Sequence, residues 1–287
     1  MIRFAKYHGC GNSFVIVREK DVRACDLCVL AEKMCSEHTG IGADGFMAVK
    51  TEPGLEMIFY NRDGSRAPMC GNGIRCFAKF CYDERICTDR QFPVETLAGR
   101  MIVEIAEESP FTVQINMGRP VFEPEACGIK GETEPYLKRT IEIEDADSAF
   151  YDGRDKNKAR FEVSSIFMGT IHTVLWTDDL DKLNKEKTGS AISNHSVYTE
   201  KTNVDMVQYV NRKMIKMQTF ERGAGMTLAC GTGACASAVI AMTEGKCDDE
   251  IEVLLPLGSL HITKNSNGEI FMRGPAAKIA DGVYEEE

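Results

Sequence analysis

The chain has 287 residues, a formal net charge of −10 and a hydrophobic fraction of 43%. This length suffices for two domains with a buried core, and the acidic balance excludes nucleic-acid binding, which needs a basic surface. No apolar run approaches the roughly 18 residues that cross a bilayer, and the N-terminus lacks the apolar segment of a signal peptide. We therefore expect a cytoplasmic protein with no membrane or nucleic-acid partner.

Strands are predicted where β-branched and aromatic residues cluster between turn residues, and helices where apolar residues recur at helical spacing. The stretch 127–160 is rich in charge and glycine and is expected to form loops around one or two strands. In chain order, the predicted elements are strands 2–7 and 14–17, helix 21–37, strands 46–50 and 55–60, helix 73–83, strands 101–106, 112–116 and 173–177, helix 182–194, strands 206–210 and 214–220, and helix 233–245.

The chain contains twelve cysteines, and in a reducing cytosol most cysteines are small buried hydrophobic residues. Cys25, Cys28, Cys35 and His38 suggest a zinc site by their spacing. If 21–37 is one helix, however, Cys25 and His38 lie about 20 Å apart, too far to share an ion whose ligands lie at about 2 Å. The sequence therefore predicts no bound metal.

An internal repeat is the most informative feature of the sequence. Residues 59–64 precede Met69-Cys70-Gly71-Asn72-Gly73, and residues 219–224 precede Ala229-Cys230-Gly231-Thr232-Gly233. The two cysteines lie 160 positions apart, as do Asn61 and Glu221, and Gly11-Asn12 and Gly169-Thr170 form a fainter match. The repeat predicts two similar domains, 1–117 and 118–274, each with one Cys-Gly-x-Gly turn before a helix.

The turn that contains Cys70 or Cys230 is suited to a specific chemistry. A helix N-terminus offers N–H groups and a partial positive charge, which favour both a bound carboxylate and a thiolate. A thiolate on one side of an amino acid and a thiol on the other can remove the α-proton and return one to the opposite face, without a cofactor. Alternatives are weaker: Gly71-x-Gly73 and Gly231-x-Gly233 do not complete a nucleotide-binding GxGxxG, and the cysteine spacings do not match zinc sites.

The chain resembles the diaminopimelate epimerase family, whose members need no pyridoxal phosphate. The similar segments follow one another in the family's order over nearly the whole chain. They are His8-Gly9-Cys10-Gly11-Asn12-Ser13-Phe14, Gly40-Ile41-Gly42-Ala43-Asp44-Gly45, Asn61-Arg62-Asp63-Gly64-Ser65, Met69-Cys70-Gly71-Asn72-Gly73-Ile74-Arg75-Cys76, Glu95-Thr96-Leu97-Ala98-Gly99, Asn203-Val204-Asp205, 221–235 and Arg273-Gly274-Pro275-Ala276.

The resemblance implies an α/β (α+β) fold with two pseudo-symmetric domains, each a curled sheet around a central helix, and an active site between them. It implies that about 275–287 return to the first domain and that the enzyme is a homodimer. The two acid–base thiols would be Cys70 and Cys230. The remaining implied site residues are backbone amides at Gly71, Asn72, Gly231 and Thr232 for the reacting carboxylate, Asn12, Asn61, Asn203, Glu221 and Arg222 for the distal end of the substrate, and His172 with Glu221 for protonation of the thiols.

The chain departs from the family pattern at two positions. Thr170 stands where the family has an Asn that contacts the distal end of the substrate, and Ser13 stands where the family has Asp. Specificity depends on such polar contacts. Two alternatives to epimerisation of LL- and meso-diaminopimelate therefore remain: a racemase of the same fold acting on histidine or a basic amino acid, and a binding protein without catalysis.

Overall fold

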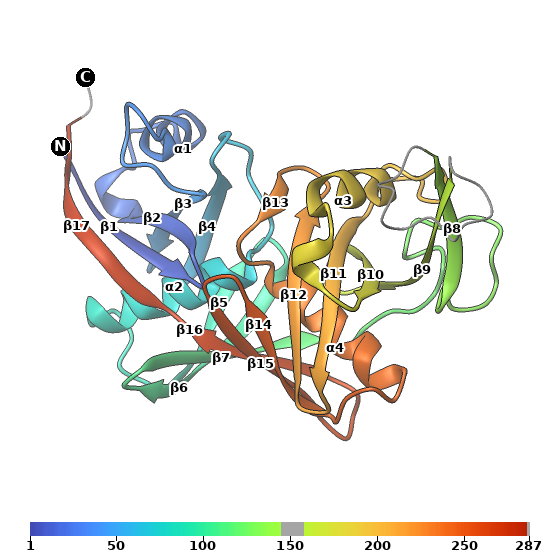
Figure 1. Cartoon of the computed structure of the whole chain (residues 1–287). Coiled ribbons are helices and arrows are strands. Elements are labelled where there is room, and N and C mark those ends of the chain that lie inside the picture. Colours follow the sequence, from blue (N-terminus) through green and yellow to red (C-terminus); the bar gives the residue numbers. More distant parts are fainter. Residues whose placement is uncertain (145–157, 286–287) are drawn as a thin grey trace. The chain divides into compact units, whose positions relative to one another are not determined.

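The computed structural model describes residues 1–144 and 158–285 (Figure 1). The chain divides into two compact units, Met1–Asn116 with Arg273–Glu287 (unit 1) and Met117–Met272 (unit 2). Part of the predicted loop region 127–160 lies outside the described residues. Within the described part of the chain, no helix is long and apolar enough to cross a membrane.

Unit 1 is a sheet that surrounds one helix. Its strands pair in the order β17-β1-β2-β3-β4-β5-β6-β7, and α2 packs against β1, β2, β3, β6 and β17. A second helix, α1 (Leu27–Cys35), lies against β3 and β4. The remaining bounds are β1 (Ile2–Gly9), β2 (Asn12–Arg18), η1 (Glu19–Asp21), β3 (Gly45–Lys50), β4 (Glu56–Asn61), α2 (Gly71–Asp83), β5 (Gln91–Thr96), β6 (Gly99–Glu108), β7 (Phe111–Gly118) and β17 (Ala277–Tyr284).

Unit 2 repeats this pattern. Its strands pair in the order β8-β9-β10-β11-β12-β14-β15, with parallel pairs β10–β11 and β12–β14 where unit 1 has β2–β3 and β4–β5. The helix α4 packs against six of these strands. The bounds are β8 (Arg139–Glu144), β9 (Lys158–Phe167), β10 (Ile171–Thr177), η3 (Leu180–Lys182), α3 (Lys185–Ser193), β11 (Asn203–Asn211), β12 (Met214–Glu221), β13 (Gly225–Thr227), α4 (Gly231–Thr243), β14 (Glu250–Leu255), β15 (Gly258–Lys264) and β16 (Ile270–Pro275).

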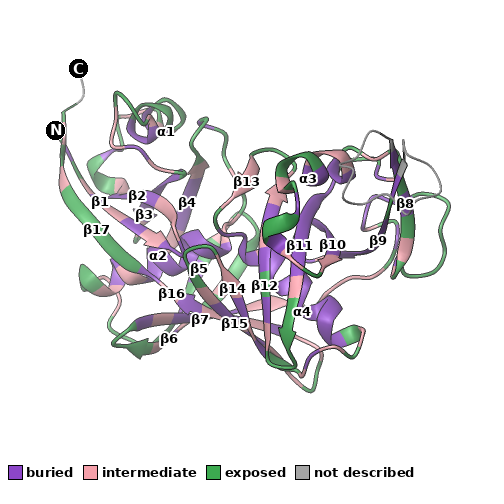
Figure 2. Cartoon of the chain, in the orientation of Figure 1, coloured by how far each residue is buried: buried purple, intermediate pink, exposed green. Residues whose placement is uncertain are grey.

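The composition of α4 explains its central place. Its sequence, Gly-Thr-Gly-Ala-Cys-Ala-Ser-Ala-Val-Ile-Ala-Met-Thr, has almost no polar face, and most of it is buried (Figure 2). A helix that is apolar on all sides is stable only when it is covered on all sides. The small side chains also let the surrounding strands approach closely. The predicted fold class, mixed α and β with curled sheets around central helices, is confirmed.

The predicted helix 21–37 is wrong. The chain forms a short 3-10 turn at Glu19–Asp21 and begins the helix α1 only at Leu27. The reason is local, because the Asp26 side chain accepts a hydrogen bond from the N–H of Cys28 at 3.0 Å and so caps the helix there. Cys25 therefore precedes the helix, and the geometric argument against zinc loses its premise. Among the described residues, no group of three or more His, Cys, Asp or Glu side chains is placed to hold a metal ion.

Candidate active site

Cys70 is the N-cap of α2. Its backbone is extended (φ −136°, ψ 123°), and its Sγ accepts a hydrogen bond from the N–H of Gly73 at 3.4 Å. The helix therefore begins at Gly71, two residues before the predicted start. Sulfur replaces the usual oxygen of an N-cap here, and the N–H of Gly73 donates to it at the positive end of the helix.

Cys230 has the same position in unit 2. It caps α4 with φ −123° and ψ 111°, and its Sγ accepts from the N–H of Gly233 at 3.4 Å. Its sulfur also lies 3.4 Å from Thr232 Oγ1. Burial, followed by the negative charges of Glu221 and Asp205, raises the pKa of the Cys230 thiol well above its ordinary value.

The similarity of the two units extends beyond the cysteines. The helices end at Glu84 and Glu244, which are 160 positions apart. The N–H of Glu84 reaches the carbonyl groups of Phe80 and Tyr82, and that of Glu244 reaches the equivalent pair in α4. The sequence repeat is therefore a structural repeat from the strand before each cysteine to the end of each helix.

In unit 1, three of the predicted residues lie together. Asn12 Oδ1 accepts a hydrogen bond from Asn72 Nδ2 at 3.4 Å and from Cys70 Sγ at 4.0 Å. Asn61 lies at the end of β4, and its amide donates to Ser65 Oγ at 2.9 Å. The structure therefore joins Asn12, Asn72 and Cys70 by hydrogen bonds, and places Asn61 in a neighbouring exposed turn.

Arg75 is a residue of this site to which the sequence analysis gave no role. It is fully buried and donates to the carbonyl oxygens of Gly71 (3.0 Å) and Pro275 (3.2 Å) and to Asn72 Oδ1 (3.0 Å). Because the guanidinium takes the Asn72 oxygen, it turns the Asn72 amide nitrogen toward Asn12. The signal in the sequence was an arginine within an otherwise apolar face of the helix.

In unit 2, a chain of hydrogen bonds runs from the strands to Cys230. His172 on β10 lies with Nδ1 2.7 Å from Asp205 Oδ2 and with Nε2 3.0 Å from Thr232 Oγ1. Asp205 on β11 also accepts from Thr219 Oγ1 at 2.7 Å. His172, Asp205 and Thr219 are all buried. The structure thus connects His172 to Cys230 through Thr232 and adds Asp205, to which the sequence analysis assigned no role.

Three of the residues predicted for the distal end of the substrate, Asn203, Glu221 and Arg222, lie where β11 begins and β12 ends. Asn203 Oδ1 accepts from the N–H of Arg222 at 3.0 Å, and Glu221 Oε1 accepts from Thr227 Oγ1 at 2.7 Å. The Arg222 guanidinium donates from one nitrogen to the carbonyl oxygens of Glu200 (3.0 Å) and Lys201 (3.4 Å). These bonds orient Asn203, Glu221 and Arg222 without any ligand.

Thr170 precedes β10, in a turn that lies next to the N-terminal end of α4. Its carbonyl accepts a hydrogen bond from the N–H of Met168 at 2.9 Å. A Cβ at the adjacent Gly169, whose φ is +74°, would lie 3.5 Å from Thr232 Cγ2. The turn that carries Thr170 therefore lies against the residue that follows Gly231.

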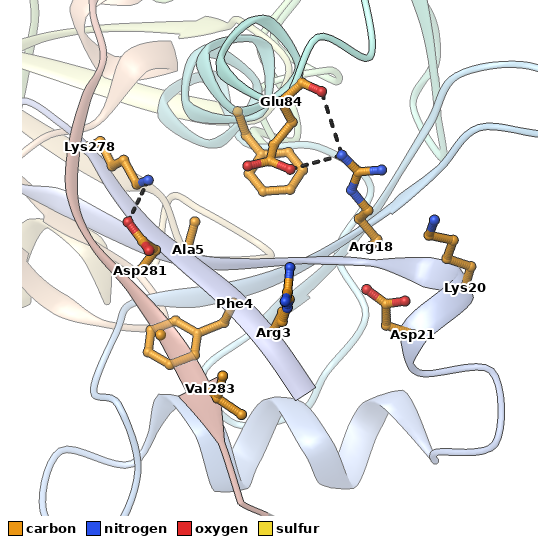
Figure 3. Close-up of a pocket in the computed structure, with 12 residues that line it drawn as sticks. Arg3, Phe4, Ala5, Arg18, Lys20, Asp21, Glu84, Lys278, Asp281 and Val283 are labelled. Atoms are coloured by element: carbon orange, nitrogen blue, oxygen red, sulfur yellow. Dashed lines mark hydrogen bonds and ion pairs between the residues drawn. The ribbon is translucent and has the colours of Figure 1, made fainter. Parts of the chain in front are cut away.

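A hollow of about 700 Å³ lies elsewhere in unit 1, among β1, β17 and the end of α2 (Figure 3). Its charged side chains largely pair with one another, with Arg18 to Glu84 at 2.8 Å and Lys278 to Asp281 at 2.6 Å. None of the cysteines lines it. Its lining includes none of the predicted site residues, so the cysteine turns remain the candidate active site.

Replacing the second glycine of each turn by alanine is expected to affect the two units unequally. A Cβ at Gly233 would overlap Asp205 Oδ1, which is held by its hydrogen bonds, whereas a Cβ at Gly73 would meet Met47 Cε, the movable end of a side chain. We expect Gly233→Ala to lower the free energy of unfolding by about 1–3 kcal/mol and Gly73→Ala to lower it less. Urea denaturation of both variants measures this, and an equal loss would contradict it.

The profile of the diaminopimelate epimerase family matches residues 4–123 and 164–279. The chain is 38% identical to a diaminopimelate epimerase of Alkaliphilus metalliredigens over 99% of this chain and 97% of that protein, and 34% identical to one of Caldanaerobacter subterraneus over 99% and 100%.

Solved structures of low sequence identity share the fold. A PhzF-family phenazine biosynthesis protein of Bacillus anthracis aligns with a TM-score of 0.65 at 16% identity over 98% of both chains, and a predicted epimerase of Pseudomonas aeruginosa aligns with a TM-score of 0.68 at 11% identity over 100% of both. The resemblance seen in the sequence is thus confirmed, and the chain belongs to the diaminopimelate epimerase family, whose members are isomerases.

Proposed function

We propose that the chain interconverts LL- and meso-diaminopimelate, in lysine and cell-wall precursor synthesis, with Cys70 and Cys230 acting on opposite faces of one α-carbon. The observation that carries the proposal is the pair of matched caps. Each sulfur accepts a hydrogen bond at 3.4 Å from the N–H of the glycine three positions later and lies at the start of a buried helix. Two thiols at equivalent helix N-caps suit a reaction in which the same type of group serves as acid on one face and as base on the other.

The backbone at the two helix starts supports the same reaction. The first N–H groups of a helix have no partner within it and carry partial positive charge. We propose that those at Gly71-Asn72 and Gly231-Thr232 hold the reacting carboxylate. As the α-proton leaves, negative charge spreads onto that carboxylate, and preoriented N–H groups stabilise it. The chemistry needs no cofactor, because the thiols and the amides supply the acid, the base and the charge stabilisation.

The distal end of the substrate is assigned mainly to Asn203 at the start of β11 and to Glu221 and Arg222 at the end of β12. Arg222 can donate two hydrogen bonds to a carboxylate from the guanidinium edge that Glu200 and Lys201 do not occupy. Asn12, Asn61, Asn203 and Thr170 would add polar contacts to the distal end, and Glu221 would receive the ammonium group there. We propose that His172 and Glu221 also support protonation of the thiols.

A second candidate is a racemase of this fold that acts on histidine or a basic amino acid. It is favoured by Thr170, whose hydroxyl is shorter than the amide that the family has at this position. A site that loses one polar contact to a distal group discriminates less strongly between substrates. Arg222 weighs against this candidate, because its charge suits a second carboxylate. The third alternative, binding without catalysis, is disfavoured because both cysteines are present and both cap helices.

The experiment that separates these candidates is α-proton exchange in deuterated buffer over a panel of amino acids. The panel contains LL- and meso-diaminopimelate, histidine, lysine and arginine, and mass spectrometry measures deuterium at the α-carbon. We expect exchange with the two diaminopimelates and none with the monocarboxylic amino acids. Exchange with histidine or a basic amino acid, and none with diaminopimelate, would replace the first candidate by the second.

We expect the decline of kcat/KM at alkaline pH to begin at an unusually high pH. Burial, and then the charges of Glu221 and Asp205, raise the pKa of Cys230 above the 9.0 of an ordinary cysteine. A raised pKa keeps the thiol protonated to higher pH, and a two-thiol enzyme loses its acid only when both thiols are ionised. We therefore expect kcat/KM to fall only above about pH 9, where an exposed thiol would already be ionised. Glu221→Gln removes one of the charges and should move this limb to lower pH.

We also propose that the enzyme acts in the cytoplasm as a homodimer. None of the cysteines forms a disulfide bond in the described part of the chain, which suits a reducing compartment. The strand β17 presents Ile279 and Val283 to solvent, 51% and 53% exposed, and so offers apolar surface to a second copy. Sedimentation velocity is expected to give twice the 31.9 kDa of the chain. A monomer at micromolar concentration would contradict the dimer.

A further inference from the structure

The two units differ beneath their matched thiols. In unit 1, Met47 on β3 pairs with Phe59 on β4, and in unit 2, Asp205 on β11 pairs with Thr219 on β12. In unit 1, Phe14 on β2 lies opposite Gly45 on β3. In unit 2, His172 on β10 lies opposite Asn203 on β11. The three positions under the helix start are therefore apolar in unit 1 and polar in unit 2.

The polar set in unit 2 has one consistent direction of hydrogen bonding. An ionised carboxylate only accepts, so Asp205 accepts from Thr219 Oγ1 and from the Nδ1–H of His172. Nε2 of the neutral ring is then an acceptor, which takes the hydroxyl hydrogen of Thr232 at 3.0 Å. Thr232 Oγ1 in turn accepts from the thiol of Cys230 at 3.4 Å. Each hydrogen bond in the chain therefore joins one donor to one acceptor.

We propose that Asp205 is a positioning residue, which holds His172 as the Nδ1–H tautomer so that Nε2 takes the Cys230 proton through Thr232. The proposal rests on the proposed function of Cys230. In the step, the S–H bond of Cys230 breaks as an O–H bond forms at Thr232, and the original O–H bond of Thr232 breaks as an N–H bond forms at His172 Nε2. The products are a Cys230 thiolate and a His172 imidazolium that faces the Asp205 carboxylate.

The charges around Cys230 make such an acceptor necessary. The groups that face the sulfur are Glu221 from β12, Asp205 from β11 and, through Thr232, His172 from β10. Both carboxylates and the burial of the sulfur oppose a lone thiolate. An imidazolium beside Asp205 forms an ion pair instead of an isolated buried charge. Cys70 differs, since its sulfur meets the Asn12 amide oxygen at 4.0 Å in a turn held by the Arg75 guanidinium.

The resting protein itself tests the tautomer. The chain has five histidines, so ¹⁵N-histidine labelling gives few signals, and the one lost in His172→Gln identifies His172. We expect the Nδ1–H tautomer at neutral pH. An Nε2–H tautomer would overturn the proposal, because Nε2 would then be unable to receive a proton.

Two substitutions test the proton path. Asp205→Asn keeps the shape but removes the charge, and it should lower kcat by about 10- to 100-fold, as loss of a carboxylate behind a functional histidine does. KM should stay within about threefold, because Asp205 does not touch the substrate. The single Nδ1–H signal should give way to a mixture of tautomers. Thr232→Val breaks the path at its middle, so kcat should fall similarly while His172 keeps its Nδ1–H signal.

Thr219→Val is the matched control within the same buried cluster. It removes a hydrogen bond to Asp205 but keeps the carboxylate and the path, so we expect a loss in kcat of no more than about threefold. The double variant Asp205→Asn/Thr232→Val should be no slower than the slower single variant, because both interrupt one path. Additive losses would overturn the proposal, as would wild-type kcat in Asp205→Asn or Thr232→Val.

The outcomes separate this proposal from the proposed function. The ¹⁵N measurements need no substrate, so they test the tautomer even if diaminopimelate shows no α-proton exchange. Exchange with diaminopimelate together with an Nε2–H tautomer would leave the function standing and remove the relay. If Asp205→Asn fails to fold, the wild-type spectrum and Thr232→Val still decide the matter.

Discussion

Cys70→Ser and Cys230→Ser are each expected to lower kcat/KM for diaminopimelate by at least about 1,000-fold, within the range that general acid–base catalysis contributes. A hydroxyl fills nearly the same space and can still cap the helix, as serine commonly does. It ionises far less readily than a thiol, however, so it cannot act as the base at neutral pH. Initial rates of epimerisation, followed by separation of the LL and meso forms, measure the loss.

The cap geometry provides a check on folding. Because serine is a good N-cap, both variants should retain the melting temperature of the unsubstituted protein within a few degrees. Cys87→Ser is the control, since Cys87 follows α2 at the end of the helix opposite Cys70. It should leave the rate unchanged. Near-normal epimerisation in either catalytic variant would refute a mechanism with two thiols.

Arg222→Met is expected to lower kcat/KM for diaminopimelate by about 100- to 1,000-fold, mostly through KM. The backbone carbonyls of Glu200 and Lys201 hold one nitrogen of this guanidinium, and we propose that its other N–H groups bind the distal carboxylate. Loss of a two-point charged hydrogen bond leaves the substrate carboxylate without a partner. Steady-state kinetics over a wide range of substrate concentration separate the effects on KM and kcat.

Arg212→Met is the matched control in the same unit. Arg212 forms an exposed ion pair with Asp248 at 2.7 Å, and exposed pairs contribute little to stability. It should therefore change neither KM nor kcat. Unchanged binding of diaminopimelate by Arg222→Met would contradict this prediction, because the distal carboxylate would then not bind at Arg222. Such a result would support the alternative of a substrate with one carboxylate.

Much of the fold could be predicted from the sequence because its signals are local. The helices α2 and α4 follow glycine-rich turns and contain long apolar segments, and the predicted helices 73–83 and 233–245 are confirmed to within two residues at each end. The strand β17 was missed for a physical reason. It runs along the outside of unit 1 with Ile279 and Val283 exposed, so its sequence lacks the alternation of a half-buried strand.

The prediction of helix 21–37 was wrong because a single polar contact sets the start of α1. The apolar spacing over 21–37 is compatible with one helix, but the Asp26 side chain binds the N–H of Cys28 and ends any continuation toward the N-terminus. Such a cap competes with the helix that the pattern predicts, and its success depends on how the preceding turn packs. Periodicity alone does not contain that information.

The sequence by itself determined the repeat, the two capping cysteines and the family. These follow from spacing along the chain and from the physics of a helix N-terminus, which needs only neighbouring residues. Only the tertiary structure decided that Asp205, His172 and Thr232 form one chain of hydrogen bonds to Cys230, and that Arg75 supports the Cys70 turn. His172, Asp205 and Thr232 are distant from one another in sequence, as are Arg75 and Pro275, and strand register and helix packing bring their groups within hydrogen-bonding distance.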